Sequence, residues 1–87
     1  MFEMKAFGSV LTGREYGKEA AKKLLKTADL SVLDFSGVVS VGSSFGDEIF
    51  KAIRTVSKSI QIAGATSMVR FSLEQSAKDH GVAVRFI

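Results

Sequence analysis

The stretch from Leu33 to Ile53 constrains the fold most, because its apolar spacing changes there from that of a strand to that of a helix. A short apolar run formed by Val32, Leu33 and Phe35 is typical of a strand. A turn rich in Gly and Ser follows over residues 36–43. Beyond it, apolar residues recur with the spacing of one helical face, at Phe45, Ile49, Ala52, Ile53 and Val56. The stretch therefore predicts a strand, a turn and a helix over 44–57.

Two serines stand at the start of this predicted helix. Ser43 or Ser44 occupies the place of an N-cap, and Ser44 with Asp47 has the spacing of a capping box. A helix N-terminus attracts anions, so a phosphate on either hydroxyl would be tolerated there and would change the surface that a partner meets. Two interpretations therefore stand side by side: the serines only cap the helix, or one of them is a phospho-acceptor.

Similar patterns divide the rest of the chain. Strands are expected at 2–7, 30–35, 59–63 and 82–87, with a loop at 8–11. Thr12 and Glu15 have capping-box spacing, which predicts a helix over 12–27 whose inner face holds Tyr16, Ala20, Ala21, Leu24 and Leu25. A third helix is expected to open at 64–67, to bury Val69, Leu73 and Ala77, and to end at Gly81.

Strands that alternate with helices predict an α/β fold with a parallel sheet and right-handed crossovers. Three of the strands alternate apolar and polar residues, so one sheet face should be covered and the other partly wet. This favours a right-handed β-α superhelix: a four-stranded, mainly parallel sheet in order 1-2-3-4 with three helices on one face. The open face is expected to carry Glu3, Lys5, Val32, Asp34, Gln61 and Arg85. The expected core is Leu33, Phe35, Ile49, Ile53, Ile60, Ile62, Val69, Leu73 and Val84.

Length and composition limit the kinds of site that this chain can form and where it is expected to be located. The 87 residues suit a single domain, 1–87, with a net charge of +3. The chain has no Cys and one His, which excludes disulfides, thiolate metal sites and Cys nucleophiles, and we expect no metal or cofactor. No apolar run approaches the ~18 residues of a membrane span, and the N-terminus lacks the apolar region of a signal peptide. A cytoplasmic protein without membrane contact is therefore expected.

Three motifs carry a resemblance to a known family: Gly13-Arg14-Glu15, Leu33-Asp34-Phe35-Ser36-Gly37-Val38 and Phe45-Gly46-Asp47-Glu48. Together with the expected architecture they resemble the STAS domain (sulfate transporter and anti-sigma factor antagonist), and more closely a bacterial STAS-like family of unknown function. Anti-sigma factor antagonists place Asp-Ser-Ser-Gly at this turn, where a kinase-like ATPase phosphorylates the first Ser. Ser43 and Ser44 match the two serines, while Gly42 and Phe45 stand in the places of the Asp and the Gly.

The resemblance implies a non-enzymatic regulatory module that binds a protein, such as a histidine-kinase-like ATPase. In open parallel sheets, binding occurs at the carboxyl ends of the strands, where the loops 7–12, 37–43 and 64–67 should gather. The residues expected to contact the partner are Thr12, Arg14, Gly42, Phe45, Asp47, Glu48 and Thr66. Simpler roles remain open for several: Asp47 and Glu48 are favoured at any helix N-terminus, and Arg14 is either simply exposed or reaches the edge near Ser44.

Parts of the sequence also suit three other functions. The row Arg14, Lys18, Lys22 and Lys26 suits either a solvated face or a nucleic-acid surface, and the lack of evident stacking aromatics disfavours nucleic acid. A homodimer could form through the wet sheet face or an edge strand. Gly42-Ser43-Ser44-Phe45-Gly46 fits a hydrolase nucleophile elbow, but the only His, His80, is expected at the opposite edge of the sheet from Ser44, as a cation at a helix C-terminus. We therefore do not expect an enzyme.

Overall fold

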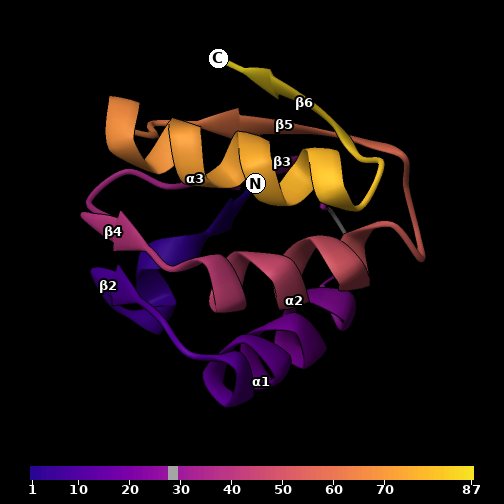
Figure 1. Cartoon of the computed structure of the whole chain (residues 1–87), viewed down its shortest axis with the longest axis horizontal. Coiled ribbons are helices and arrows are strands. Elements are labelled where there is room, and N and C mark those ends of the chain that lie inside the picture. Colours follow the sequence, from indigo (N-terminus) through magenta and orange to yellow (C-terminus); the bar gives the residue numbers. More distant parts are fainter. Residues whose placement is uncertain (28–29) are drawn as a thin grey trace.

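The structure, a computed structural model, describes residues 1–27 and 30–87 and is a mixed α/β fold (Figure 1). Its elements, in chain order, are β1 (Phe2–Glu3), the 3-10 helix η1 (Met4–Phe7), β2 (Val10–Leu11), α1 (Arg14–Leu25), β3 (Val32–Asp34), β4 (Ser40–Val41), α2 (Ser43–Ile53), β5 (Ser59–Ala63), α3 (Ser67–Asp79) and β6 (Ala83–Phe86).

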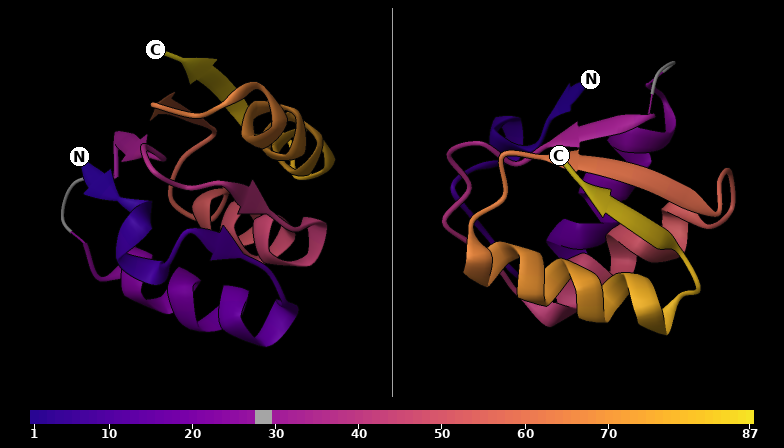
Figure 2. Two further views of the ribbon diagram at one scale, coloured as in Figure 1. Left: turned by 90° about the vertical axis from the view of Figure 1, so that its left-hand side faces the viewer. Right: turned by 90° about the horizontal axis from the view of Figure 1, so that it is seen from above.

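The described strands form two parallel sheets. The larger has the order β1-β3-β5-β6, and the smaller pairs β2 with β4. The expected four-stranded parallel sheet is present, but the expected order 1-2-3-4 is matched only in part: β2 and β4 come between its strands along the chain and form a second sheet. In Figure 2 these four strands lie in one layer, and α1, α2 and α3 lie together on one side of it.

The N-terminal strand is shorter than expected. Strand pairing ends at Glu3, and the chain then turns through η1, which closes with the Gly8 amide donating to the Lys5 carbonyl at 2.9 Å. This turn places Met4 in the core with 0% exposure. Apolar residues at alternate positions from 2 to 6 suggested a strand, but burial of Met4 is achieved by a tight turn instead. Lys5 consequently lies in η1 and not on the open sheet face.

The small sheet replaces parts of an expected loop and an expected turn. Val10 and Leu11 pair with Ser40 and Val41, which buries Leu11 and Val41 at 0% and 5% exposure. Two-residue strands are too short to give a readable alternation, so neither was predicted. Their pairing ties the segment before α1 to the segment before α2.

Two of the expected helix caps are wrong. α1 begins after Gly13, whose φ of 92° suits glycine, and α2 begins after Gly42; neither helix has a side-chain cap. The Thr12–Glu15 and Ser44–Asp47 capping boxes are therefore not formed, and Ser43 and Ser44 lie inside the first turn of α2. The third start is confirmed: the Thr66 hydroxyl accepts from the Val69 amide at 3.3 Å.

The core lies between the helices and the inner face of the large sheet. Eight of the nine expected core residues are buried at 5% exposure or less, and Val84 is only partly buried. Tyr16, Leu25 and Val56 are more exposed than expected, at 38%, 44% and 62%. The Tyr16 ring lies across Phe7 and Phe45, and its hydroxyl donates to the Phe7 carbonyl, so it covers the edge of the core and does not enter it.

The open face of the sheet follows the expected alternation. Along β5, Ile60 and Ile62 are buried while Ser59 is exposed and Gln61 half-buried. The Asp34 carboxylate on this face accepts from the Ser36 amide at 2.9 Å. Hydrogen bonds from the Ser36 side chain and backbone hold the pKa of Asp34 below its ordinary value.

Candidate functional site

The loops after the strands do gather at one edge. The Val39 amide donates to the Ser9 carbonyl at 2.7 Å, and the Gly42 amide donates to the Leu11 carbonyl at 2.8 Å. The third loop joins them, because one hollow of about 470 Å³ is lined by residues of two loops and the start of α3: Gly37, Val38, Val39, Thr66, Ser67 and Met68. The expected binding edge is therefore assembled by the fold.

A second hollow, of about 360 Å³, contains both candidate phospho-acceptors. Ser43 is exposed and Ser44 half-buried at the start of α2, and Arg14 from α1 faces the same space. The remaining lining comes from α2 and α3: Asp47, Phe71, Ser72, Gln75, Ser76 and Asp79. Arg14 thus reaches the edge near Ser44, which was one of its two expected positions.

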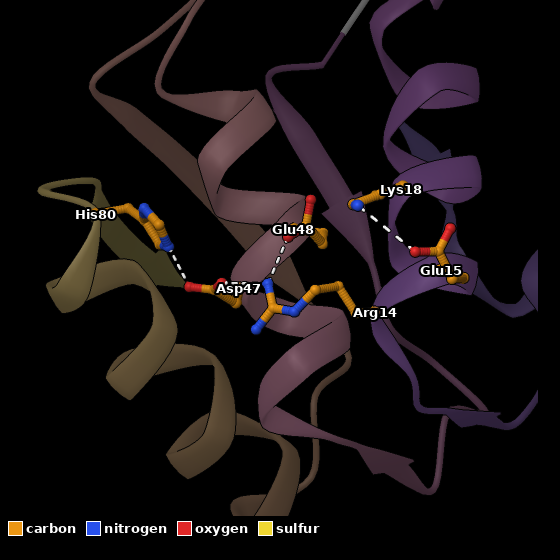
Figure 3. A network of polar contacts seen from close by, with 6 residues as sticks. All are labelled: Arg14, Glu15, Lys18, Asp47, Glu48 and His80. Atoms are coloured by element: carbon orange, nitrogen blue, oxygen red, sulfur yellow. Dashed lines mark hydrogen bonds and ion pairs between the residues drawn. The ribbon is translucent and has the colours of Figure 1, made fainter.

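Arg14 joins α1 to α2. Its Nη1 donates to Asp47 Oδ2 at 2.7 Å and to Glu48 Oε2 at 2.5 Å (Figure 3). Charge-assisted bonds of this kind are stronger than neutral ones. Only 7% of the Glu48 side chain is exposed, so the bond from Arg14 balances a carboxylate charge that is almost fully buried. The hydrogen bonds to Asp47 and Glu48 raise the pKa of Arg14 above its ordinary value.

Asp47 also binds the end of α3. His80 Nε2 contacts Asp47 Oδ1, so the carboxylate lies between a guanidinium and an imidazole (Figure 3). Hydrogen bonds from Arg14, and then from His80, hold the pKa of Asp47 below its ordinary value. His80 follows α3 as expected, with Gly81 at φ 68° ending the helix, but it lies against a residue one turn from Ser44. The expected separation of His80 and Ser44 across the sheet was wrong.

Most residues expected to contact a partner reach the surface. Five are exposed or half-buried: Thr12, Arg14, Gly42, Asp47 and Thr66. Phe45 and Glu48 are buried, at 0% and 7% exposure, so their side chains do not lie on the surface that a partner would touch. Phe45 packs against Tyr16, and Glu48 neutralises Arg14.

Sequence reasoning missed three exposed apolar residues near both hollows. Val39, Met68 and Phe71 have 63%, 76% and 66% of their surface exposed. Met68 and Phe71 lie outside the buried stripe of α3, which passes through Val69, Leu73 and Ala77, and that position off the stripe was the available signal. Large apolar side chains exposed together often mark an interaction surface.

The basic row on α1 is partly neutralised within the chain. Arg14 binds two carboxylates of α2, and Lys18 Nζ lies 3.5 Å from Glu15 Oε1 (Figure 3). Lys22 and Lys26 are exposed. Fewer cations are therefore offered to an outside anion than the sequence row suggested.

Comparisons of this chain with protein-family models, with curated proteins and with solved structures find no match. Within residues 1–27 and 30–87, no helix has both the length and the apolar character needed to cross a membrane. In the same residues, no group of three or more His, Asp or Glu side chains is placed to hold a metal ion.

Proposed function

We propose that this chain is a non-enzymatic, STAS-like regulatory module whose carboxyl sheet edge binds a protein partner. The observation that carries the proposal is the pair of serines at the start of α2. Neither Ser43 nor Ser44 caps its helix, and both line a hollow beside exposed Phe71. Serine hydroxyls that do not cap the helix and lie beside an exposed apolar surface are suited to contact a protein partner, and phosphorylation of one of them could change that contact.

Electrostatics support Ser43 as the phospho-acceptor. It is the more exposed of the two serines, and it stands at the first position of α2, where backbone amides lack helical partners. A phosphate there would bring a charge of roughly −1.5 to −2 to a positive helix end, in a hollow lined by Arg14, already paired with two carboxylates, and by Asp47 and Asp79. The modified state would be tolerated by the fold while the surface became strongly anionic.

The class of partner follows from the resemblance of the sequence to anti-sigma factor antagonists. The proposed partner is a histidine-kinase-like ATPase that binds the unmodified edge and phosphorylates it. The proposal includes the finer architecture of that family, a right-handed β-α superhelix, and a cytoplasmic location, where the kinase would find ATP.

The experiment is purification of the chain from its own cells, with the co-purifying proteins and any phosphorylated residue identified by mass spectrometry. We expect an ATPase of this class and a phosphate on Ser43. Ser43→Asp should then weaken binding to the purified ATPase at least about tenfold, because the added charge must lose its hydration in the contact.

Two controls sharpen this test. Val56→Asp adds the same charge to an exposed position just beyond the other end of α2 and should bind like the parent. Ser67 is an exposed serine at the first position of α3 and should carry no phosphate. If Ser43→Asp binds like the parent and no phosphate is found on Ser43 or Ser44, the proposed switch is wrong.

A further inference from the structure

In both views of Figure 2, none of the described helices lies over the outer face of the four-stranded sheet. The strand register defines two rows of side chains on this face. Glu3, Asp34 and Ala63 form one row across β1, β3 and β5. The other row, across β3, β5 and β6, is Val32, Gln61 and Arg85.

The first row begins with two acids directly opposite each other. Glu3 of β1 is the register partner of Asp34 of β3. Like charges in this position destabilise a sheet unless a cation lies between them. Hydrogen bonds from Ser36 lower the pKa of Asp34, which favours its charged form. Among the described residues, neither Glu3 nor Asp34 forms an ion pair with a cation.

A cation of the required kind stands at the other edge of the same face. Arg85 of β6 is exposed, lies opposite uncharged Gln61, and forms no ion pair within the described part of the chain. Between the acids and Arg85 lie Val32, Gln61 and Ala63, which are uncharged and half-buried. The face is therefore acidic at the β1–β3 side, neutral in the middle and basic at β6.

We propose that this open sheet face binds a second copy of the chain about a two-fold axis that runs along the strands. Such an axis reverses the strand order between two facing sheets, so β1 of each copy lies over β6 of the other. Glu3 of one copy then lies over β6, the strand that carries Arg85 of its partner, and Asp34 lies one strand away, over β5. The same arrangement occurs twice. An axis across the strands would instead place acid over acid, which the charges disfavour.

The two rows are two residues apart, or about 7 Å along a strand, a displacement that the long Arg85 side chain can cover. Val32 and Ala63 would pack in the centre, where small uncharged side chains let the two sheets approach. The hollow with Ser43 lies among the helices, on the other side of the sheet. Pairing of two sheet faces therefore leaves the proposed partner edge open and does not depend on it.

The test is sedimentation equilibrium of the full chain over a dilution series. The parent should be a dimer that dissociates on dilution and more readily at high salt. Arg85→Glu and Glu3→Arg should each raise the dimer dissociation constant at least about tenfold, since every substitution alters both symmetric contacts. Combining Glu3→Arg with Arg85→Glu should restore at least part of the lost affinity, because opposite charges again face each other.

Lys22→Glu, an equal charge reversal on the exposed side of α1, is the matched control and should leave the dissociation constant unchanged. Circular dichroism melts of each variant separate loss of association from loss of folding. A parent that stays monomeric at its highest soluble concentration overturns the proposal, as does a dimer that Arg85→Glu leaves intact. A face that only a different protein covers, with the parent alone monomeric, overturns it as well.

Discussion

At the scale of single residues, the helix starts differ in what their hydroxyls do. Thr66 Oγ1 accepts from the Val69 amide at the start of α3, whereas α2 starts after Gly42 without a side-chain cap. Thr66→Ala should therefore lower the free energy of unfolding by ~0.5–2 kcal/mol. Ser44→Ala should change it by no more than about 0.5 kcal/mol, because no capping bond is lost. Urea denaturation of the two variants checks this, and an equal loss in both would mean that Ser44 does cap α2.

Asp47 gives the molecule a dependence on pH with a definite sign. Its pKa is lowered in the fold by Arg14 and then by His80, so its folded value lies below its unfolded one. The stabilisation is therefore complete above the unfolded pKa and is lost as the pH falls through the folded pKa. Measured between neutral and acid pH, the parent should lose more unfolding free energy than Asp47→Asn, which has no proton to gain. Parallel curves for the two proteins would show that Asp47 is not coupled to folding.

At the scale of elements, α1 and α2 pack closely enough to require glycine. A Cβ on Gly17 would lie 3.0 Å from Glu48 Cβ and 3.1 Å from both the Phe45 Cα and its carbonyl oxygen. Backbone atoms cannot move aside cheaply, so Gly17→Ala should destabilise the protein by ~1–3 kcal/mol, although Ala is the better helix former. Thermal or urea melts test this beside Glu19→Ala on the exposed side of α1, which should stay within about 0.5 kcal/mol of the parent. A Gly17→Ala protein more stable than the parent would contradict the close approach.

Between α2 and α3, unlike between α1 and α2, the space next to the glycine is filled by a side chain and not by backbone. A Cβ on Gly46 would lie 2.7 Å from Ser76 Oγ but 3.4 Å from Ser76 Cβ. Gly46→Ala should therefore be destabilising alone and less so in combination with Ser76→Ala, which removes the obstructing oxygen. A double-mutant cycle of unfolding free energies should give a coupling of ~0.5–3 kcal/mol. Additive effects would mean that the two residues do not meet.

The elements that the sequence predicted well are those long enough to show a period. β5 has the expected bounds of Ser59–Ala63, and α3 buries the stripe of Val69, Leu73 and Ala77. β2 and β4 have two residues each, and their backbone pairing leaves no pattern in the side chains. The capping boxes failed for a related reason: glycines at positions 13 and 42 take the cap conformation, and spacing alone could not show which residue would.

At the scale of the whole molecule, the site was predictable where it depended on topology and not where it depended on packing. Parallel strands bring their carboxyl ends together, so the gathering of the three loops followed from the strand pattern. The contact of Arg14 with Asp47 and of Asp47 with His80 depends on how three helices lie against one another. Helix orientation leaves no mark on spacing within a single helix, so this network was not foreseen. The exposure of Met68 and Phe71 was likewise set by which side of α3 faces the sheet.

One core joins the helical layer to the sheet, and Leu33 lies at its centre. It is 0% exposed on β3, with Phe2 and Ile62 as its register partners. Leu33→Ala should cost ~2–5 kcal/mol through lost burial and the cavity that remains. The matched control, Val39→Ala at a position with 63% exposure, should change the unfolding free energy by less than about 0.5 kcal/mol.

The same variant tests whether the two layers unfold together. Tyr16, the only Tyr, lies against Phe7 and Phe45 on the α1 side, so its fluorescence reports on helix packing, whereas far-ultraviolet circular dichroism reports on all elements. If the chain is one cooperative unit, both signals should follow a single transition, and Leu33→Ala should move both midpoints equally although the substitution is in the sheet. Midpoints that separate, with Tyr16 keeping the parent's transition, would show that the α1–α2 pair holds its packing without the sheet. In that case the buried side chains of the helices and the sheet would not form one cooperative core.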